Sequence, residues 1–218
     1  MPCLTTPRAA ALLTGTALFL AAAPGTAMAQ DACLGARAAP SGQTLDQAAG
    51  AVVCLVNAER MRHGLRALRA DGDLRQAAGR HSRNMVRRGF FSHVTPDGAD
   101  LSDRLRRSGY VHGTSGRVGE TLGWGTGTPS SPNRIVAAWI ESPPHYRILL
   151  GRRLRDVGVG VAAGTPQTTT GGGRGATYTL DTGVRTSAGG SSATAPSILR
   201  SRIGQASSLL GYLSKELV

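Results

Sequence analysis

The stretch Arg88-Gly-Phe-Phe-Ser-His-Val-Thr-Pro-Asp-Gly98 places a histidine, His93, between an aromatic pair and a turn sequence. Proline presets one backbone dihedral and Asp and Gly tolerate the others, so Pro96-Asp-Gly98 is typical of a tight turn. Phe90 and Phe91 are large and apolar, and we expect them to anchor the segment in a hydrophobic core. The imidazole of His93 is therefore predicted to lie at the rim of a cleft.

Two later segments carry polar groups that could meet His93. One is Gly119-Glu-Thr-Leu-Gly-Trp124 and the other is Trp139-Ile-Glu-Ser-Pro-Pro-His145. Proline cannot continue a helix but is favoured at its first position, so Ser142-Pro143 predicts a new helical turn carrying His145. We expect His93, Glu120 and His145 to converge on one cleft, although 27 and 25 residues separate them along the chain.

The first 29 residues have the pattern of a secretory signal peptide. Arg8 is the one charge before an apolar run, and Ala27-Met-Ala29 is a small-x-small cleavage signal. The apolar run is too short to span a bilayer comfortably, and no transmembrane segment is expected after cleavage. These features predict a secreted protein that is extracellular or associated with the cell envelope.

Cleavage leaves two cysteines, Cys33 and Cys54. In an oxidising compartment the expected state is one disulfide, which would tie an N-terminal lead-in, residues 30–44, to the first helix. Closing a loop of about 20 residues would stabilise the fold by roughly 3 kcal/mol. A free or metal-bound pair is the alternative.

The chain is strongly basic, with 25 Lys and Arg against 13 Asp and Glu and a net charge of +12. Lys215 is the single lysine, so arginine carries nearly all of the positive charge. Such a surface can hold anionic cell-wall polymers or phospholipid head groups. A solvated basic surface with compositional bias is the simpler alternative. Because no basic groove is interleaved with aromatic residues, no specific nucleic-acid partner is expected.

Helical patterns come first in the chain and strand patterns come last. Apolar residues recur at helical spacing over 45–62 and 74–85, 101–108 resembles a short helix, and Asn133 is a candidate cap for another. Residues 157–162 and 177–184 have the patterns of strands. This order predicts an α+β fold with an antiparallel sheet. Residues 186–196 are typical of a Ser/Gly/Thr linker, and residues 197–218 of an amphipathic C-terminal helix.

An ordered set of short motifs resembles one known family. The motifs are Leu55-Val-Asn-Ala-Glu-Arg60, His81-Ser-Arg-Asn-Met85, Phe91-Ser-His93, Gly119-Glu120, Trp139-x-x-Ser142-x-x-His145, Val157-Gly-Val-Gly160 and Tyr178-Thr-Leu-Asp-Thr-Gly183. Together they resemble the CAP superfamily of cysteine-rich secretory proteins, antigen 5 and pathogenesis-related proteins, in its bacterial secreted single-domain branch. The resemblance covers residues 45–185. It implies a three-layer α–β–α sandwich with a central antiparallel sheet.

The resemblance also implies a cleft with two histidines and two glutamates, which in some members holds a divalent metal such as zinc. His93 matches the first histidine, Glu120 the first glutamate and His145 the second histidine. Ser142 stands where the second glutamate is expected, and Glu141, one residue or about 100° away on a helix, should face elsewhere. The fourth member of the cleft is open, with His81 as a candidate because it lies on the apolar face of its helix.

Two imidazoles and a carboxylate suit zinc, so His93, Glu120 and His145 are candidate metal ligands. The alternative is a hydrogen-bonded cluster without metal. Enzymatic activity is uncertain and is not favoured, because the chain has neither Gly-x-Ser-x-Gly nor a reactive cysteine. The favoured interpretation is a secreted binding module for a lipid, a glycan or a peptide. A metal-dependent hydrolase or peptidase that uses the same cleft and a structural envelope-associated protein are the alternatives.

Overall fold

The computed structural model describes residues 33–41, 43–111, 116–167 and 174–185 of the chain. All of them belong to one compact unit that ends at Thr186. The expected signal peptide, the linker 186–196 and the C-terminal helix 197–218 lie outside the described residues. They therefore stay predictions from the sequence.

Helices and strands follow one another in a mixed order. The elements are α2 (Leu45–Arg62), β1 (Arg69–Ala70), α3 (Gly72–Arg88), α4 (Leu101–Ser108), β2 (Val118–Thr126), the 3-10 turn η1 (Thr128–Ser130), α5 (Pro132–Glu141), α6 (Pro143–Leu149), β3 (Asp156–Ala163) and β4 (Gly175–Gly183).

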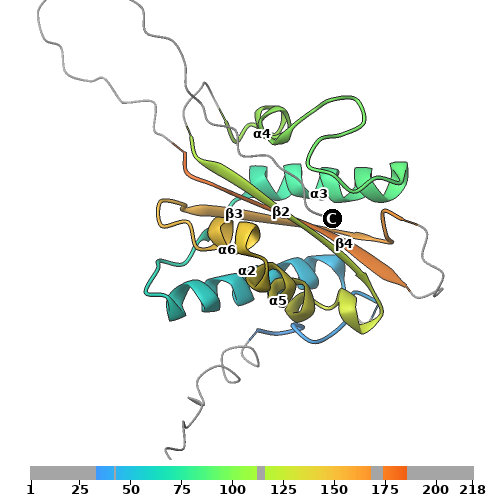
Figure 1. Cartoon of the computed structure of the whole chain (residues 1–218), viewed down its shortest axis with the longest axis horizontal. Coiled ribbons are helices and arrows are strands. Elements are labelled where there is room, and N and C mark those ends of the chain that lie inside the picture. Colours follow the sequence, from blue (N-terminus) through green and yellow to red (C-terminus); the bar gives the residue numbers. More distant parts are fainter. Residues whose placement is uncertain (1–32, 42, 112–115, 168–173, 186–218) are drawn as a thin grey trace, which may run out of the picture. The chain divides into compact units, whose positions relative to one another are not determined.

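The strands form one sheet in the order β1-β3-β4-β2, with helices on both faces (Figure 1). The α3 and α4 helices cover one face, and α2, α5 and α6 cover the other. β4 pairs antiparallel with both β2 and β3, and this register places Glu120 opposite Asp181. The expected α+β class and the α–β–α sandwich are confirmed.

The sheet differs from the expectation at one edge. The two-residue strand β1 pairs parallel with β3, through Arg69 with Asp156 and Ala70 with Val157. An antiparallel sheet was predicted because the strand patterns come last in the chain, whereas β1 comes before α3. Two residues are too short to show a strand period, so the sequence carried no signal for this pairing.

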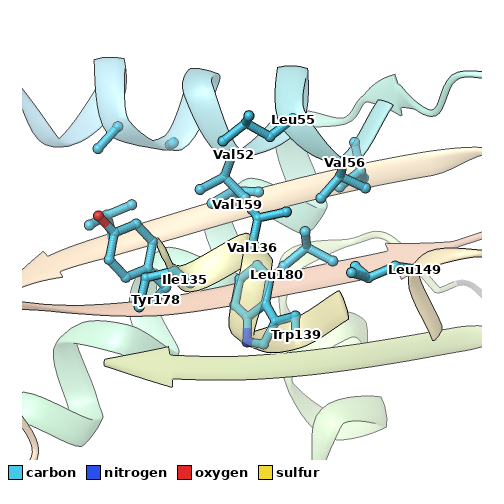
Figure 2. Packing of buried hydrophobic residues seen from close by; sticks show 14 of the residues in the cluster. Val52, Leu55, Val56, Ile135, Val136, Trp139, Leu149, Val159, Tyr178 and Leu180 are labelled. Atoms are coloured by element: carbon cyan, nitrogen blue, oxygen red, sulfur yellow. The ribbon is translucent and has the colours of Figure 1, made fainter. Parts of the chain in front are cut away.

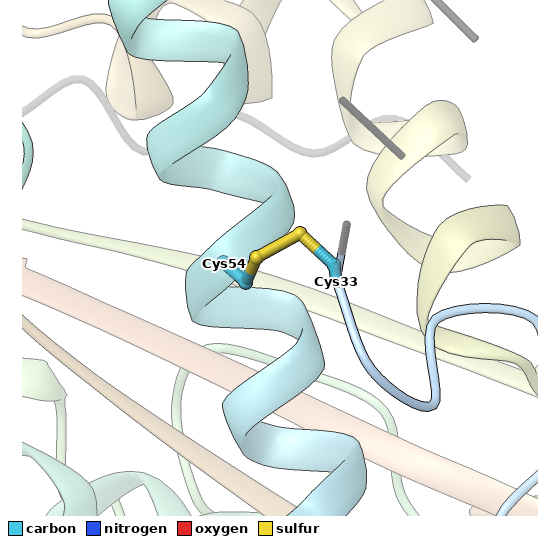
Figure 3. The surroundings of a disulfide bond; sticks show 2 residues. All are labelled: Cys33 and Cys54. Atoms are coloured by element: carbon cyan, nitrogen blue, oxygen red, sulfur yellow. A yellow bond between two sulfur atoms is a disulfide. The ribbon is translucent and has the colours of Figure 1, made fainter. Parts of the chain in front are cut away.

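The main core lies between α2, α5 and the sheet (Figure 2). Val52 and Val56 of α2 belong to the same cluster as Trp139 of α5, whose indole nitrogen donates a hydrogen bond to the Leu122 carbonyl at 2.7 Å. The Cys33–Cys54 disulfide is formed and ties the segment before α2 to the middle of that helix (Figure 3). The expected disulfide partner assignment is therefore correct.

Helix ends follow the capping chemistry of the sequence. Thr44 begins α2 with a reciprocal capping box to Gln47, and Asp71 caps α3. The α4 helix runs from Leu101 to Ser108 and ends at a left-handed Gly109, as predicted. The predicted start of α5 was wrong: its cap is Ser131 and not Asn133, because Pro132 takes the first helical position.

The α3 helix packs unusually close to the sheet. A Cβ atom on Gly160 would lie 2.1 Å from the backbone nitrogen of Gly79, so only glycine permits this contact. The same face carries a hydrogen bond from the Ser82 hydroxyl to the Gly160 carbonyl, at 3.0 Å. This contact holds α3, the helix that precedes the segment carrying His93, against β3.

Candidate functional site

The segment that carries His93 begins where α3 ends, at the left-handed Gly89. The predicted turn is present: the Gly98 amide donates to the Thr95 carbonyl at 2.8 Å, and Gly98 has a φ of 84°, which favours glycine. Buried Thr95 closes the loop through bonds to Ala99. The turn therefore holds His93 at the surface by hydrogen bonds.

The predicted aromatic anchor was partly wrong. Phe91 is 39% exposed, and Val94, on the other side of His93, is 43% exposed. Phe90 is partly buried and meets the imidazole of His81 edge-on, with ring centroids 6.0 Å apart. Because the chain turns away from the core after Gly89, only the first of the two phenylalanines packs inward.

His93 and Glu120 lie side by side although 27 residues separate them. The His93 Nδ1 donates to the Glu120 Oε1 at 2.7 Å. The carboxylate is buried, with 3% of its side chain exposed, whereas half of the His93 side chain is exposed. This arrangement fixes the ring through Nδ1 and leaves Nε2 without a role in holding Glu120.

Arg104 of α4 completes the contacts of Glu120. Its Nη2 donates to the Glu120 Oε2 at 2.5 Å, and its Nη1 donates to the His93 carbonyl at 2.8 Å. The guanidinium is almost fully buried, with 7% of the side chain exposed. One arginine therefore positions both the backbone of His93 and the acid that orients its ring.

Sequence reasoning missed Arg104, although a signal was present. Leu101, Arg104 and Leu105 lie at helical spacing on one face of α4, and Leu105 is fully buried. A charged residue on the apolar face of a short helix indicates a buried partner of opposite charge. The identity of that partner could not be read from the sequence, because it lies on a strand 16 residues away.

Glu120 is held in its charged form. Burial opposes its ionisation, but the hydrogen bond from His93 and the charge of Arg104 outweigh burial and lower its pKa. Both oxygens already accept hydrogen bonds from protein donors. This carboxylate therefore serves to hold the site together.

Asp181 of β4 lies directly across the sheet from Glu120 and was also missed. Burial and then the negative charge of Glu120 raise its pKa well above the ordinary value. Among the described residues, neither of its oxygens has a hydrogen-bond partner, so only the charge of Arg104 offsets the cost of burying an anion there. Burial and the neighbouring anion therefore both favour the neutral form of Asp181.

His81 is buried and contacts the backbone of the segment that carries His93. It is 1% exposed, and its Nε2 donates to the Ser92 carbonyl at 3.0 Å. Burial lowers its pKa to about 4, with a smaller opposing effect from Glu120. The neutral imidazole supports the backbone of the segment that carries His93.

The α6 helix carries His145 toward the same region. His145 is partly buried, and burial followed by the charge of His93 lowers its pKa. Ser142 takes the predicted position before α6, without a capping hydrogen bond from its side chain, and Glu141 is exposed. The contacts of the site thus join His93 and Glu120 directly, and join His145 to them only through the electrostatic effect of His93.

The residues present do not fit a zinc site with three protein ligands. Over the described ranges, no three His, Cys, Asp or Glu side chains are grouped to hold a metal ion. Arg104 and His93 take both oxygens of Glu120, so this acid is not a free ligand. The expected set of His93, Glu120 and His145 is therefore not supported as a metal centre.

The lowered pKa of His81 predicts acid sensitivity. In the unfolded chain this histidine binds a proton below about pH 6.5, whereas in the fold it does so only below about pH 4. Stability from His81 is thus complete above pH 6.5 and is lost as the pH falls toward 4, by about 3 kcal/mol at most. Urea unfolding at several pH values should show this loss, and His81→Gln should show much less of it.

The difference between the two profiles isolates His81. The raised pKa of Asp181 acts in the opposite sense, because it removes stability as the pH rises above the ordinary carboxyl range. This contribution is shared by the wild type and by His81→Gln, and so it cancels. Parallel profiles for the two proteins would contradict a neutral, buried His81.

The chain is thus a small α–β–α domain in which a buried acid on an edge strand orients a half-exposed histidine. The model of the CAP: Cysteine-rich secretory protein family matches residues 53–178, more than half of the chain. The protein belongs to this family, as the sequence motifs predicted.

Two curated proteins of a bacterium are similar to this chain. The chain is 32% identical over 109 residues to an uncharacterized protein, YkwD, of Bacillus subtilis, covering 50% of this chain and 40% of that protein. It is 31% identical over 111 residues to an uncharacterized membrane protein, YlbC, of the same organism, covering 50% of this chain and 30% of that protein. This chain therefore spans less than half the length of these curated relatives.

A solved structure also resembles it. An extracellular protein containing a SCP domain from Bacillus anthracis shares 25% identity with a TM-score of 0.50, covering 64% of this chain and 43% of that protein. Within the part of the chain that the structure describes, none of the helices has the length and apolar character needed to cross a membrane.

Proposed function

We propose that this protein is a secreted CAP-domain binding protein of the cell envelope or the medium. Its cleft of His93, Glu120 and His145, with Ser142 at its margin, would take a lipid, a glycan or a peptide. The observation that carries the proposal is the placement of His93: its ring is oriented by a buried acid, yet half of its side chain is exposed.

The surroundings of His93 support binding. Phe91 and Val94, close neighbours of His93 in the chain, expose apolar side chains. An apolar rim around one fixed polar group is the usual composition of a small-molecule site. A ligand that combines an apolar part with a hydrogen-bonding group, as an amphiphile or a peptide does, suits this rim.

The contacts of Glu120 favour binding over hydrolysis. A general base must be free to take a proton, and both Glu120 oxygens are already bonded to His93 and Arg104. The serine beside His93, Ser92, accepts a hydrogen bond from the Val94 amide, so its hydroxyl belongs to the turn. These groups stabilise the loop, and the proposal assigns them no chemical step.

Binding can be tested by sedimentation with phosphatidylglycerol vesicles, with purified cell-wall sacculi and with a peptide mixture. The double variant Phe91→Ser/Val94→Ser removes the apolar rim, and His93→Ala removes its polar centre. Each should lower the retained fraction of the protein at least about tenfold. Met61→Ser is the matched control, since Met61 is also an exposed apolar residue, 60% exposed on α2. If none of the three probes retained the wild-type protein, the proposal would be contradicted.

Salt distinguishes the site from the basic surface. Retention that survives both cleft variants but disappears in moderate salt would show adhesion of the +12 chain to anionic polymers. That outcome would replace the proposed binding cleft with a structural, envelope-associated role.

Zinc affinity is expected to be weak. With Glu120 engaged, only the two imidazoles of His93 and His145 remain, and two ligands do not make a stable tetrahedral site. Titration calorimetry should give no dissociation constant below about 10 µM for the wild type. Much tighter binding that both His93→Ala and His145→Ala abolish would show that the metal displaces Arg104.

A further inference from the structure

A concave surface lies at the other edge of the sheet, away from His93. It is a groove of about 380 Å³ between α2 and α3 along β3. Its lining includes Asp46 of α2, Arg75, Gly79 and Arg83 of α3, and Val159 and Val161 of β3. Because β2 and its cleft are at the opposite end of the strand order, this groove is independent of the proposed function.

The groove exposes an open strand edge. On this side β3 pairs with β1 only at Asp156 and Val157, and the last bond runs from the Asp71 amide to the Val157 carbonyl at 2.9 Å. Backbone groups alternate along a strand, so those of Val159 and Val161 face the same edge as those of Val157. Among the described residues no strand pairs with β3 beyond this point on that edge.

An open edge is a template for another strand. Chains commonly cover such an edge with a long side chain, a helix or a bulge, yet here α2 and α3 stand on the two faces and leave a space between them. A segment added to this edge would gain backbone hydrogen bonds, whatever its side chains, and the walls of the groove would select among sequences.

The rim of the groove is cationic. Arg75 and Arg83 lie eight residues apart on α3, and therefore on one helical face. Arg75 pairs with Asp46 at 3.5 Å, with the two side chains 63% and 78% exposed. A pair this exposed contributes little, so an incoming carboxylate can replace Asp46 without a large penalty.

We propose that the β3 edge binds an extended peptide segment as an additional strand, with an acidic side chain placed against Arg75 and Arg83. The main-chain groups of Val159 and Val161 supply the strand hydrogen bonds. The two arginines supply charge selectivity. The ligand class is thus an acidic, β-forming peptide stretch of a partner protein.

The test uses nuclear magnetic resonance of the ¹⁵N-labelled protein with the capped hexapeptide TVEVTV as the probe. The amides of Val159 and Val161 should shift downfield and become protected from solvent exchange. Two further peptides carry N-methyl groups at alternate positions. Only one of them should lose binding, because only alternate amides of an added strand face β3.

The role of charge is tested with the double variant Arg75→Glu/Arg83→Glu, which should bind the hexapeptide at least about tenfold more weakly than the wild type. Arg80→Glu is the matched control, an exposed arginine on the same helix that does not line the groove, and it should bind within about twofold of the wild type. Thermal unfolding of each variant shows whether the fold is kept.

Three outcomes would overturn the proposal. The first is the absence of any shift at Val159 and Val161 up to about 5 mM peptide, a concentration at which even weak complexes form. The second is equal binding of both N-methylated peptides. The third is binding of poly-glutamate or of anionic vesicles at the same amides with no binding of the hexapeptide, which would make the groove a site for anions or membranes.

Discussion

Replacement of Arg104 by methionine is expected to lower the free energy of unfolding by roughly 3–5 kcal/mol. Methionine approximates the aliphatic part of the arginine side chain but removes the guanidinium, so Glu120 stays charged without its partner, with only 3% of its side chain exposed. The His93 carbonyl also loses its buried donor. A buried charge without its partner is among the largest single sources of destabilisation.

Denaturant unfolding of paired variants isolates this effect. Arg106→Met on the same helix is the matched control, because Arg106 pairs with Asp103 while 56% of its side chain is exposed, so it should change stability by less than about 1 kcal/mol. Arg104→Met/Glu120→Met should recover most of the loss, since removing both charges leaves an apolar contact. A single variant as stable as the wild type would show that Glu120 is solvated or neutral.

The same variant separates stability from binding. If Arg104 positions His93, Arg104→Met should weaken ligand retention even at a temperature where it is fully folded. The change in retention should then resemble that of His93→Ala. A purely structural arginine would lower the melting temperature and leave retention by the folded fraction unchanged.

Much of the fold could be predicted because it is encoded locally. The Asp100 cap and Gly109 bound a helix of the predicted extent, and Val157 alternates with glycines in the pattern of a strand. The disulfide followed from an even number of cysteines. Each of these features depends on neighbouring residues or on simple counting, and so the sequence alone carries it.

The features that were missed depend on contacts between distant segments. The β2 strand has a weak strand pattern because it contains Gly119 and Gly123, and a Cβ atom on Gly119 would lie 2.8 Å from Ile148 of α6. Glycine is needed there for packing, which hides the strand period. The place of Asp181 in the site likewise could not be predicted, because it depends on the strand register that places this residue opposite Glu120.

The site was predictable in outline but not in its charge balance. The family motif brought His93 and Glu120 together correctly, since they are bonded at 2.7 Å. Nothing in the motif showed that an arginine from α4 would neutralise the acid. This arginine changes the interpretation of the cleft from a candidate metal centre to a set of fixed hydrogen bonds around one exposed imidazole.

Removal of the Cys33–Cys54 disulfide is the second large effect, with an expected loss of about 3 kcal/mol. The bond closes a loop with a sequence separation of 21. In the chain-entropy model, removing the bond raises the conformational entropy of the unfolded chain and so stabilises the unfolded state. The double variant Cys33→Ser/Cys54→Ser avoids a free thiol. Its unfolding in urea should begin at lower concentration than that of the wild type.

The native structure itself should change little in that variant. The Asn133 amide still donates to the Ala36 carbonyl at 2.9 Å, and Gln43 still bonds to the carbonyls of Gly35 and Ala38. The amide spectrum around His93 should therefore match that of the wild type. Dithiothreitol should lower the stability of the wild type to that of the variant and leave the variant unaffected.

This prediction also bears on the compartment. A bond that supplies about 3 kcal/mol is a sizeable part of the stability of an ordinary domain, which is about 5–15 kcal/mol. A protein that relies on it needs an oxidising environment, because cytoplasmic thiols are kept reduced. If the double serine variant proved as stable as the wild type, the disulfide would no longer support export, and the proposed secretion would depend on residues 1–29 alone.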